Sequence, residues 1–153
     1  MTPERLTAED PRLPEALALI QRSFAYMEER IDPPSSIREL TVQKMSEQCD
    51  IGEIWALGAP IAACMFLTPK EEGLYLGKLA VDGNKRGAGL ARCLVERAVQ
   101  RARELHLPAI ELQTRVELVE NHTAFSRLGF VQTGATAHDG YDRPTSLVFR
   151  RFV

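Results

Sequence analysis

The chain has 153 residues, of which 44% are apolar and 26% are charged, and its net charge is −2. This composition is typical of a globular protein with a buried core and excludes a disordered or fibrous chain. The charge balance argues against a nucleic-acid binder that depends on a broad basic field. No apolar run is long enough for a membrane span, and the three cysteines form no CxxC pair, so we expect neither a disulfide framework nor a metal site. The N-terminal residues lack the apolar core of a signal peptide. We therefore expect a cytoplasmic protein without nucleic-acid or membrane partners, folded as one domain over residues 1–153.

The N-terminal third predicts one short strand and two helices. Residues 4–7 favour the strand, and the Asp-Pro pair at 10–11 is typical of a helix start. Apolar residues at steps of three and four predict that this amphipathic helix continues to Met27. A capping-box pattern at 36–39 predicts a second helix that ends near Glu47.

After the second helix the period changes to that of strands. Residues 51–57 and 61–67 are apolar runs separated by a Gly-Ala-Pro turn, so they predict a hairpin. Residues 74–81 predict a third strand, and a glycine-bearing segment follows it at once. A long helix is expected over residues 88–106, because apolar side chains line one of its faces.

The remaining chain predicts a strand at 109–114 and a short helix at 120–128 that Gly129 stops. Two strands, at 130–133 and 146–152, complete the pattern. This alternation of strands and helices indicates a mixed α/β sheet.

The most informative segment, residues 81–91, lies between the third strand and the long helix. Gly87 and Gly89 let the backbone approach a ligand closely, because no side chain stands in the way. The first turn of a helix exposes unpaired N–H groups and the positive end of the helix dipole, which together suit a pyrophosphate. Three side chains add positive charge beside it: Lys85, Arg86 and Arg92.

Two common nucleotide loops do not fit this segment. A P-loop requires GxxxxGK[ST], but counting from Gly83 its second glycine is Ala88, and no Lys-Ser or Lys-Thr follows Gly89. The dinucleotide fingerprint GxGxxG starts at Gly87 but has Arg92 in place of its third glycine. A glycine turn that caps an ordinary helix remains as the structural alternative.

The segment Arg86-Gly87-Ala88-Gly89-Leu90-Ala91 resembles motif A of the GNAT acetyltransferases, whose pattern is Arg/Gln-x-x-Gly-x-Gly/Ala. Residues 121–130, which begin with Asn121 and end in Leu-Gly-Phe, resemble motif B of the same family. The resemblance extends over essentially the whole chain. It implies an α/β fold of the GNAT type, a mostly antiparallel six- to seven-stranded sheet with a central parallel pair and about four helices.

The resemblance also implies a function. The protein would transfer an acetyl group from acetyl-coenzyme A, as co-substrate and without a metal, to a primary amine of a small molecule or peptide. Backbone N–H groups of motif A would hold the pyrophosphate, and the strand at 79–81 would pair with the pantetheine arm. The residues implied for coenzyme A are Leu79, Ala80, Val81, Arg86, Gly87, Ala88, Gly89, Leu90, Ala91, Asn121 and Phe125. The fold would also allow a homodimer.

Two other functions remain open. The chain would be a coenzyme A-binding regulatory or accessory module if it binds the donor with little catalysis. It would be an unrelated phosphate-binding domain if it has no affinity for coenzyme A.

Acetyl transfer needs a proton acceptor for the amine and a donor that stabilises the oxyanion. By resemblance, the oxyanion donor is a backbone N–H near residues 79–81. Tyr75 stands where family members often place a carboxylate or a water-holding residue, so it would order a water or take the proton unless it only packs. Glu111 and His122 are further candidates for the base, and a solvent-facing side chain is the alternative for each. Phe125 stands where many members have a tyrosine that protonates the leaving thiolate.

The resemblance places acceptor recognition in the first helix-loop-helix and in the loop between the last two strands. Both segments are rich in charge, and their carboxylates would suit a cationic amine. These carboxylates belong to Glu28, Glu29, Asp32, Asp139 and Asp142.

Overall fold

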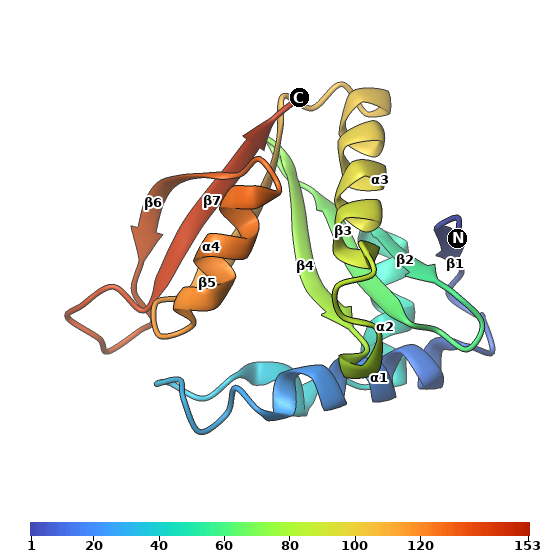
Figure 1. Ribbon diagram of the computed structural model, residues 1–153, viewed down its shortest axis with the longest axis horizontal. Helices are drawn as coiled ribbons and strands as arrows, with labels where there is room; N and C mark the ends of the chain where they lie inside the picture. Colours follow the sequence, from blue (N-terminus) through green and yellow to red (C-terminus); the bar gives the residue numbers. More distant parts are fainter.

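Seven strands form one sheet in the order β1-β2-β3-β4-β5-β7-β6 in the computed structural model, which describes residues 1–153 (Figure 1). All neighbouring strands are antiparallel except β4 and β5, which are parallel. The mixed sheet with one central parallel pair is therefore confirmed. The strands are β1 (Glu4–Leu6), β2 (Glu53–Leu57), β3 (Ala63–Pro69), β4 (Leu74–Val81), β5 (Ala109–Arg115), β6 (Val131–Thr136) and β7 (Ser146–Phe152).

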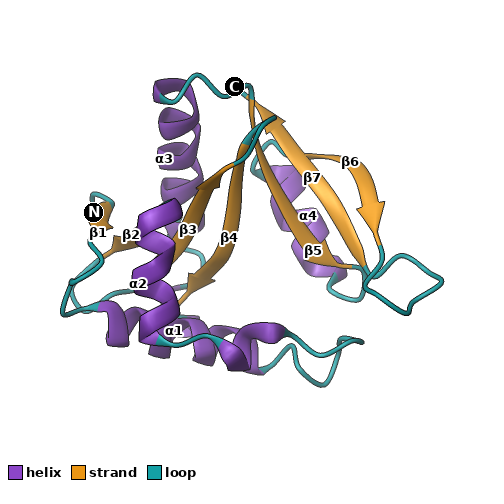
Figure 2. Cartoon of the chain, turned by 180° about the vertical axis from the view of Figure 1, so that it is seen from behind, coloured by secondary structure: helices purple, strands orange, loops and turns teal.

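Helices cover both faces of this sheet. In Figure 1, α3 and α4 lie in front of the strands, and Figure 2 shows α2 against the opposite face, with α1 running across one end of β3 and β4. No helix combines the length and apolarity that a membrane span requires. The helices are α1 (Leu13–Ala25), α2 (Val42–Ile51), α3 (Leu90–Glu104) and α4 (Val119–Arg127), with short 3-10 turns η1 (Ser36–Glu39) and η2 (Gly83–Lys85).

The strand period of two divides the core into two layers. In β2, Trp55 and Leu57 pack on the α3 side of the sheet, whereas Ile54 and Ala56 pack against α1 and α2. Because successive side chains of a strand point to opposite faces, an apolar run buried on both sides builds both layers at once. This explains why the hairpin runs are continuously apolar rather than alternating.

β4 and β5 diverge soon after they meet. Only two residue pairs, Leu74 with Ile110 and Tyr75 with Glu111, are in register between them. Beyond Tyr75 the two strands separate, as both views show (Figures 1 and 2). The β5-facing edge of β4 from residue 76 to residue 81 is therefore without a strand partner. This divergence positions the candidate site.

The first two helices differ from the sequence prediction. α1 begins at Leu13 rather than at 10–11: the Asp10 carboxylate accepts hydrogen bonds from the Arg12 backbone and side chain, but residues 11–12 form a turn that precedes the helix. The predicted second helix is divided into η1 and α2. Leu40 is extended, and Thr41 caps α2 by accepting a hydrogen bond from the Lys44 N–H at 3.1 Å. Thr41 is the effective cap because its hydroxyl satisfies an N–H of the first helical turn.

Several strand and helix ends also shift. α2 continues to Ile51 and stops at Gly52, so the hairpin begins at Glu53 and its second strand runs from Ala63 to Pro69. α3 begins two residues later than predicted, because Gly89 adopts a left-handed φ of 77° that a helix interior excludes. The strand predicted at 74–81 is confirmed at both ends.

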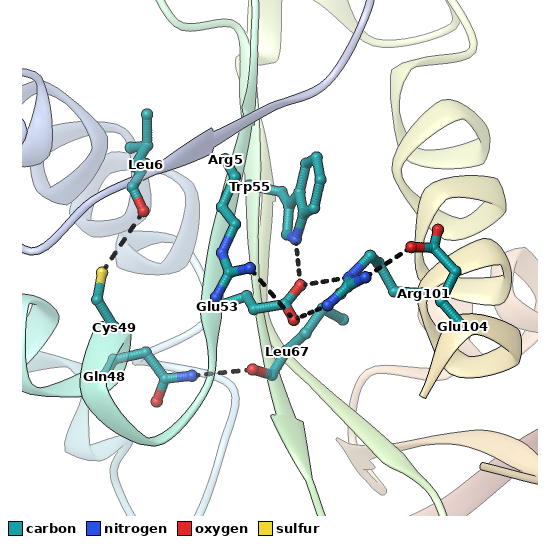
Figure 3. Close-up of polar contacts among 9 residues, drawn as sticks. All are labelled: Arg5, Leu6, Gln48, Cys49, Glu53, Trp55, Leu67, Arg101 and Glu104. Carbon is teal, nitrogen blue, oxygen red and sulfur yellow. Dashed lines mark hydrogen bonds and ion pairs between the residues drawn. The ribbon is translucent and has the colours of Figure 1, made fainter. Parts of the chain in front are cut away.

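A buried carboxylate ties the sheet to α3 (Figure 3). Glu53, which is 4% exposed, accepts hydrogen bonds from Trp55 Nε1 at 2.7 Å and from Arg101 Nε and Nη2 at 3.0 and 2.6 Å. Arg101 also contacts Glu104, and Arg5 lies 3.9 Å from Glu53. Burial raises the pKa of Glu53, but the hydrogen bonds from Arg101 and Trp55 outweigh it and hold the pKa below its usual value. A buried charge is tolerated only with such partners.

Candidate active site

A groove opens where β4 passes into α3. Gly87 and Gly89 have φ values of 82° and 77°, in the left-handed region that disfavours side chains. A Cβ added at either glycine would meet no protein atom within 4 Å, so both face open space. The two glycines therefore leave the backbone of this segment exposed to the groove.

The backbone of this segment is rich in unused donors. None of the N–H groups from Gly87 to Arg92 donates a hydrogen bond to another backbone group. They lie at the positive end of the α3 dipole, and such groups favour an anion.

The side chains around the groove add to this preference. Its cavity of about 470 Å³ has no aspartate or glutamate in its lining. The Arg86 guanidinium lies 5.6 Å from the centre of the Tyr26 ring, and Arg92 donates to the Arg127 carbonyl at 3.2 Å. The four cationic side chains of the lining are Lys85, Arg86, Arg92 and Arg127. Repeated positive charge without a counter-ion fits a polyanionic ligand.

The structure brings the residues predicted for coenzyme A together around this groove. All of them line it except Ala88. Their ligand contacts stay a prediction. Those in the lining are Leu79, Ala80, Val81, Arg86, Gly87, Gly89, Leu90, Ala91, Asn121 and Phe125.

A second cavity, of about 310 Å³, lies where β4 and β5 diverge; we call it the cleft. Tyr75, Lys78 and Leu79 contribute to it from β4, and Gln113 and Arg115 from β5. Its apolar part is lined by Phe24, Met27, Ile31, Ile37, Leu112, Leu118 and Phe125.

A β-bulge in β4 changes which side chains reach the cleft. Phe66 pairs with Gly77 and Cys64 with Ala80, so Lys78 and Leu79 together oppose one residue of β3. Lys78 adopts a φ of 51°, which is uncommon for a residue with a Cβ. The alternation of β4 reverses across the bulge, since Leu76 packs on the α3 side and Ala80 packs with α1.

The groove and the cleft share one wall. Five residues line both cavities, and they come from α1, the turn that follows it, β4 and α4. A ligand in the groove would therefore reach a ligand in the cleft at this wall. The five are Phe24, Met27, Leu79, Asn121 and Phe125.

The two predicted catalytic side chains lie in different surroundings. Tyr75 lines the cleft, and burial first and then the nearby Glu111 carboxylate raise its pKa. Glu111 lines a separate cavity beside the turn at 70–73, and Arg150 donates to its Oε1 from Nε at 2.9 Å and from Nη2 at 2.7 Å. The structure thus does not place the Glu111 carboxylate in the cleft. His122 is absent from the lining of both cavities, and its Nε2 lies 3.0 Å from the Arg115 carbonyl.

The carboxylates expected to attract a cationic acceptor also lie elsewhere. Asp32 accepts hydrogen bonds from Tyr141 at 2.5 Å and from Arg143 at 3.3 Å, and Glu28 forms an ion pair with Arg38. None of the five lines the cleft. The structure also contains no group of three or more His, Cys, Asp or Glu side chains that could hold a metal ion.

Comparison with known proteins decides the family. Residues 14–130 match the model of the Acetyltransferase (GNAT) family. The chain belongs to the GNAT acetyltransferases. It is similar to N-alpha-acetyltransferase 30 of Saccharomyces cerevisiae, with 36% identity over 58 residues. That match covers 38% of this chain and only 33% of the relative.

Solved structures agree on the GNAT fold. An acetyltransferase of the GNAT family from Staphylococcus aureus Mu50 superposes with a TM-score of 0.75 at 14% identity, over 99% of each chain. An acetyltransferase from Bacillus anthracis in complex with acetyl coenzyme A gives a TM-score of 0.60 at 21% identity. That second match covers 67% of this chain and 62% of the other. At these identities the similarity establishes the fold.

Within the GNAT framework, Phe125 occupies the wall between groove and cleft without a polar group. Its ring packs against Phe130 and Phe149, with centroids 6.0 and 6.4 Å away. The protein therefore presents a hydrocarbon surface at the position where the sequence suggested a missing proton donor.

Sequence reasoning missed three contributors to this GNAT site. Arg127 lines the groove at the end of α4, and Ser23 of α1 donates to the Val81 carbonyl at 3.3 Å beside it. Lys78 lies in the cleft because of the bulge. The helical period of α1 indicated which residues are buried, but not that its C-terminal end covers a ligand cavity.

Proposed function

We propose that this GNAT protein transfers an acetyl group from acetyl-coenzyme A to a primary amine by direct attack in a ternary complex. The wall shared by the groove and the cleft carries this proposal, because a donor in one cavity and an acceptor in the other would meet there. Holding two reactants side by side removes much of the entropic barrier of a bimolecular step.

The groove fits the donor. Its unused N–H groups from Gly87 to Arg92 would hold the pyrophosphate, and its four cationic side chains would balance the phosphate charges. The pantetheine arm would lie along the unpaired edge of β4, whose N–H and C=O groups at 79–81 have no strand partner on the β5 side. Bound there, coenzyme A supplies an activated acetyl thioester.

The chain contributes to the chemistry by positioning the two reactants and by offering a backbone hydrogen-bond donor. A backbone N–H of the bulged stretch near Leu79 would donate to the thioester oxygen as negative charge develops on it. Because Phe125 has no proton to give, the thiolate would leave unassisted or take a proton from water. A thiol pKa of about 8.5 makes this acceptable at neutral pH.

Two side chains of the cleft are candidates for deprotonating the amine. The raised pKa of Tyr75 keeps its phenol protonated at neutral pH, so Tyr75 would order a water rather than act as the base itself. His138 lines the cleft, with its Nδ1 beside Thr145 Oγ1 at 2.5 Å. Imidazole titrates closest to neutral pH of all side chains, so His138 is the better candidate for the proton acceptor. Glu111 is a weaker candidate for the proton acceptor, because its carboxylate accepts two hydrogen bonds from Arg150.

One observation favours a second function. The absence of a proton donor at Phe125 is also what a coenzyme A-binding module with little catalysis would show. Thiol release distinguishes the two functions, because a binding module holds the donor but frees no thiol when amines are added.

The experiment is an acetyl-coenzyme A assay across amino acids, peptides, polyamines and aminoglycosides. We expect thiol release above the rate of donor hydrolysis for one class, together with a mass increase of one acetyl group on that amine. Binding of the donor without release for any amine would favour the module. Absence of donor binding would contradict both functions.

A further inference from the structure

The cleft is positively charged in a way that the transfer reaction alone does not require. No aspartate or glutamate lines it, whereas Lys78 and Arg115 do. An amine-binding cavity would ordinarily offer carboxylates to an ammonium group. This cavity instead lacks counter-charges of its own.

Lys78 is the least compensated of these groups. The bulge turns this residue into the cleft, and burial is the sole cause that lowers the pKa of its ammonium group. No protein carboxylate forms an ion pair with it. A charged group taken from water without a partner is costly, so the site favours a ligand that supplies the missing anion.

The neighbouring charges do not neutralise the cleft. The Arg115 guanidinium donates to the Pro33 carbonyl at 2.7 Å and the Pro34 carbonyl at 3.3 Å, and neutral acceptors leave its charge in place. Glu120 pairs with Arg30, Asp32 binds Tyr141 and Arg143, and Glu117 accepts a hydrogen bond from the Asp32 N–H at 3.1 Å, and none of these three carboxylates lines the cleft. The positive potential of the cleft therefore persists.

We infer that the amine acceptor also carries a carboxylate, which the Lys78 ammonium binds while the apolar lining of the cleft holds the rest of the molecule. This inference rests on the proposed acetyl transfer. A carboxylate suits this site, because Lys78 forms no ion pair in the protein, Arg115 is held by two backbone carbonyls, and half of the residues that line the cleft are apolar. The acceptor class is thus an apolar amino acid or a similar small amino carboxylate.

The inference excludes several acceptors that the sequence left open. Polyamines and aminoglycosides carry several ammonium groups, and the cleft offers none of the carboxylates that would bind them. Their additional charges would face Lys78 and Arg115 and be repelled.

The test compares matched acceptors on the wild-type protein. Apolar amino acids are assayed against their carboxamides, which keep the amine and the side chain but lose the negative charge. We expect kcat/KM to favour the acids by about 10- to 100-fold, the effect of one charge-assisted hydrogen bond.

The Lys78→Met variant then tests whether Lys78 is the residue that binds the carboxylate of the acceptor. Methionine keeps an unbranched stem and removes the charge, so the ratio of acid to amide should fall toward one through a rise in the KM of the acid. Lys44→Met is the matched control, because Lys44 is exposed on α2 and should keep the wild-type ratio. Lys78→Gln repeats the test if the methionine variant does not fold.

The outcomes separate the inference from the function on which it rests. Thiol release with equal preference for acids and amides, or with polyamines ahead of both, would overturn the inference and leave acetyl transfer standing. If no amine is turned over, calorimetry decides the question on protein loaded with coenzyme A. N-acetylated apolar amino acids should then bind to the wild type and lose affinity in Lys78→Met. Equal binding of their amides, or no binding, would contradict the inference.

Discussion

The groove and the cleft adjoin at one wall, yet they are built from different parts of the chain. The groove presents main-chain N–H groups held open by two glycines, whereas the cleft presents side chains from the diverging edges of β4 and β5. A site made of backbone depends on local geometry and tolerates change in most side chains. A site made of side chains is altered by single substitutions. The comparison indicates that binding of the donor depends on the fold of the backbone, whereas binding of the acceptor depends on a few side chains.

The largest effect is expected at the groove. Gly89→Val places a branched side chain where the pyrophosphate would lie, so affinity for coenzyme A should fall by at least about 100-fold, comparable to the loss of two charge-assisted hydrogen bonds. Isothermal titration calorimetry measures this loss. Gly140→Val is the matched control, because Gly140 has a φ of 85° and equally open surroundings but lies in the loop between β6 and β7. A control that loses coenzyme A equally would show that backbone strain, not obstruction, is responsible.

The second effect lies outside both sites. Glu53→Ala leaves Arg101 without its main partner and should lower the free energy of unfolding by about 2–3 kcal/mol, less than for a fully buried pair because Arg101 keeps some contact with water. Glu104→Ala removes only the exposed contact of Arg101, so the free energy of unfolding should change by less than about 0.5 kcal/mol. Denaturant titration measures both. Coenzyme A affinity of folded Glu53→Ala should match the wild type, and a large loss would show that the groove depends on this network.

The same carboxylate predicts a pH dependence. The folded-state pKa of Glu53 lies below its unfolded value, so its stabilising contribution is complete above that value and is lost as the pH falls through the folded-state pKa. The difference in unfolding free energy between wild type and Glu53→Ala should therefore be constant at neutral pH and shrink below about pH 4.5. A difference that grows on acidification would contradict this sign.

A smaller effect is expected in the cleft. Tyr75→Phe removes the hydroxyl that we propose to order a water, and kcat at saturating donor should fall about 5- to 10-fold, less than for a group that exchanges the proton itself. Tyr141→Phe, outside the cleft, should stay within about twofold by the same reasoning. Coenzyme A affinity should not change in either variant. An unchanged rate for Tyr75→Phe would remove Tyr75 from the mechanism.

The smallest effect is expected at the shared wall. Phe125→Tyr restores a hydroxyl beside the leaving thiol, but kcat should rise by less than about threefold, because a thiol of pKa about 8.5 leaves readily without an acid. Steady-state kinetics measures the change. A rise above tenfold would show that departure of the thiolate limits the reaction.

The sequence predicted the elements whose signals are local. β4 and the glycine segment before α3 are recognisable from an apolar run, two glycines and a helical period, all within neighbouring residues. The break at Leu40 was not predicted, because 36–39 and Thr41 both offer helix starts and only packing decides between them. The coenzyme A groove was predictable for the same reason as β4, since it is one continuous segment.

The cleft was not predictable, because long-range geometry creates it. The bulge at Lys78 leaves no trace in the pattern of β4, where the other seven of the eight residues are apolar or glycine. The Glu111 side chain was a reasonable candidate on its strand, but its ion pair with Arg150 depends on β7. The same applies to Asp32, whose partners Tyr141 and Arg143 stand more than a hundred residues away in the chain.

The most direct test of the account is a backbone ¹⁵N–¹H correlation spectrum recorded during titration with coenzyme A. If the groove holds the pyrophosphate through main-chain donors, the amide signals from Gly87 to Arg92 should show the largest shifts, and those of Gly140 and its neighbours should stay in place. Small shifts at 87–92, with the main changes elsewhere or with no saturable binding, would contradict a donor site built from the backbone at the start of α3.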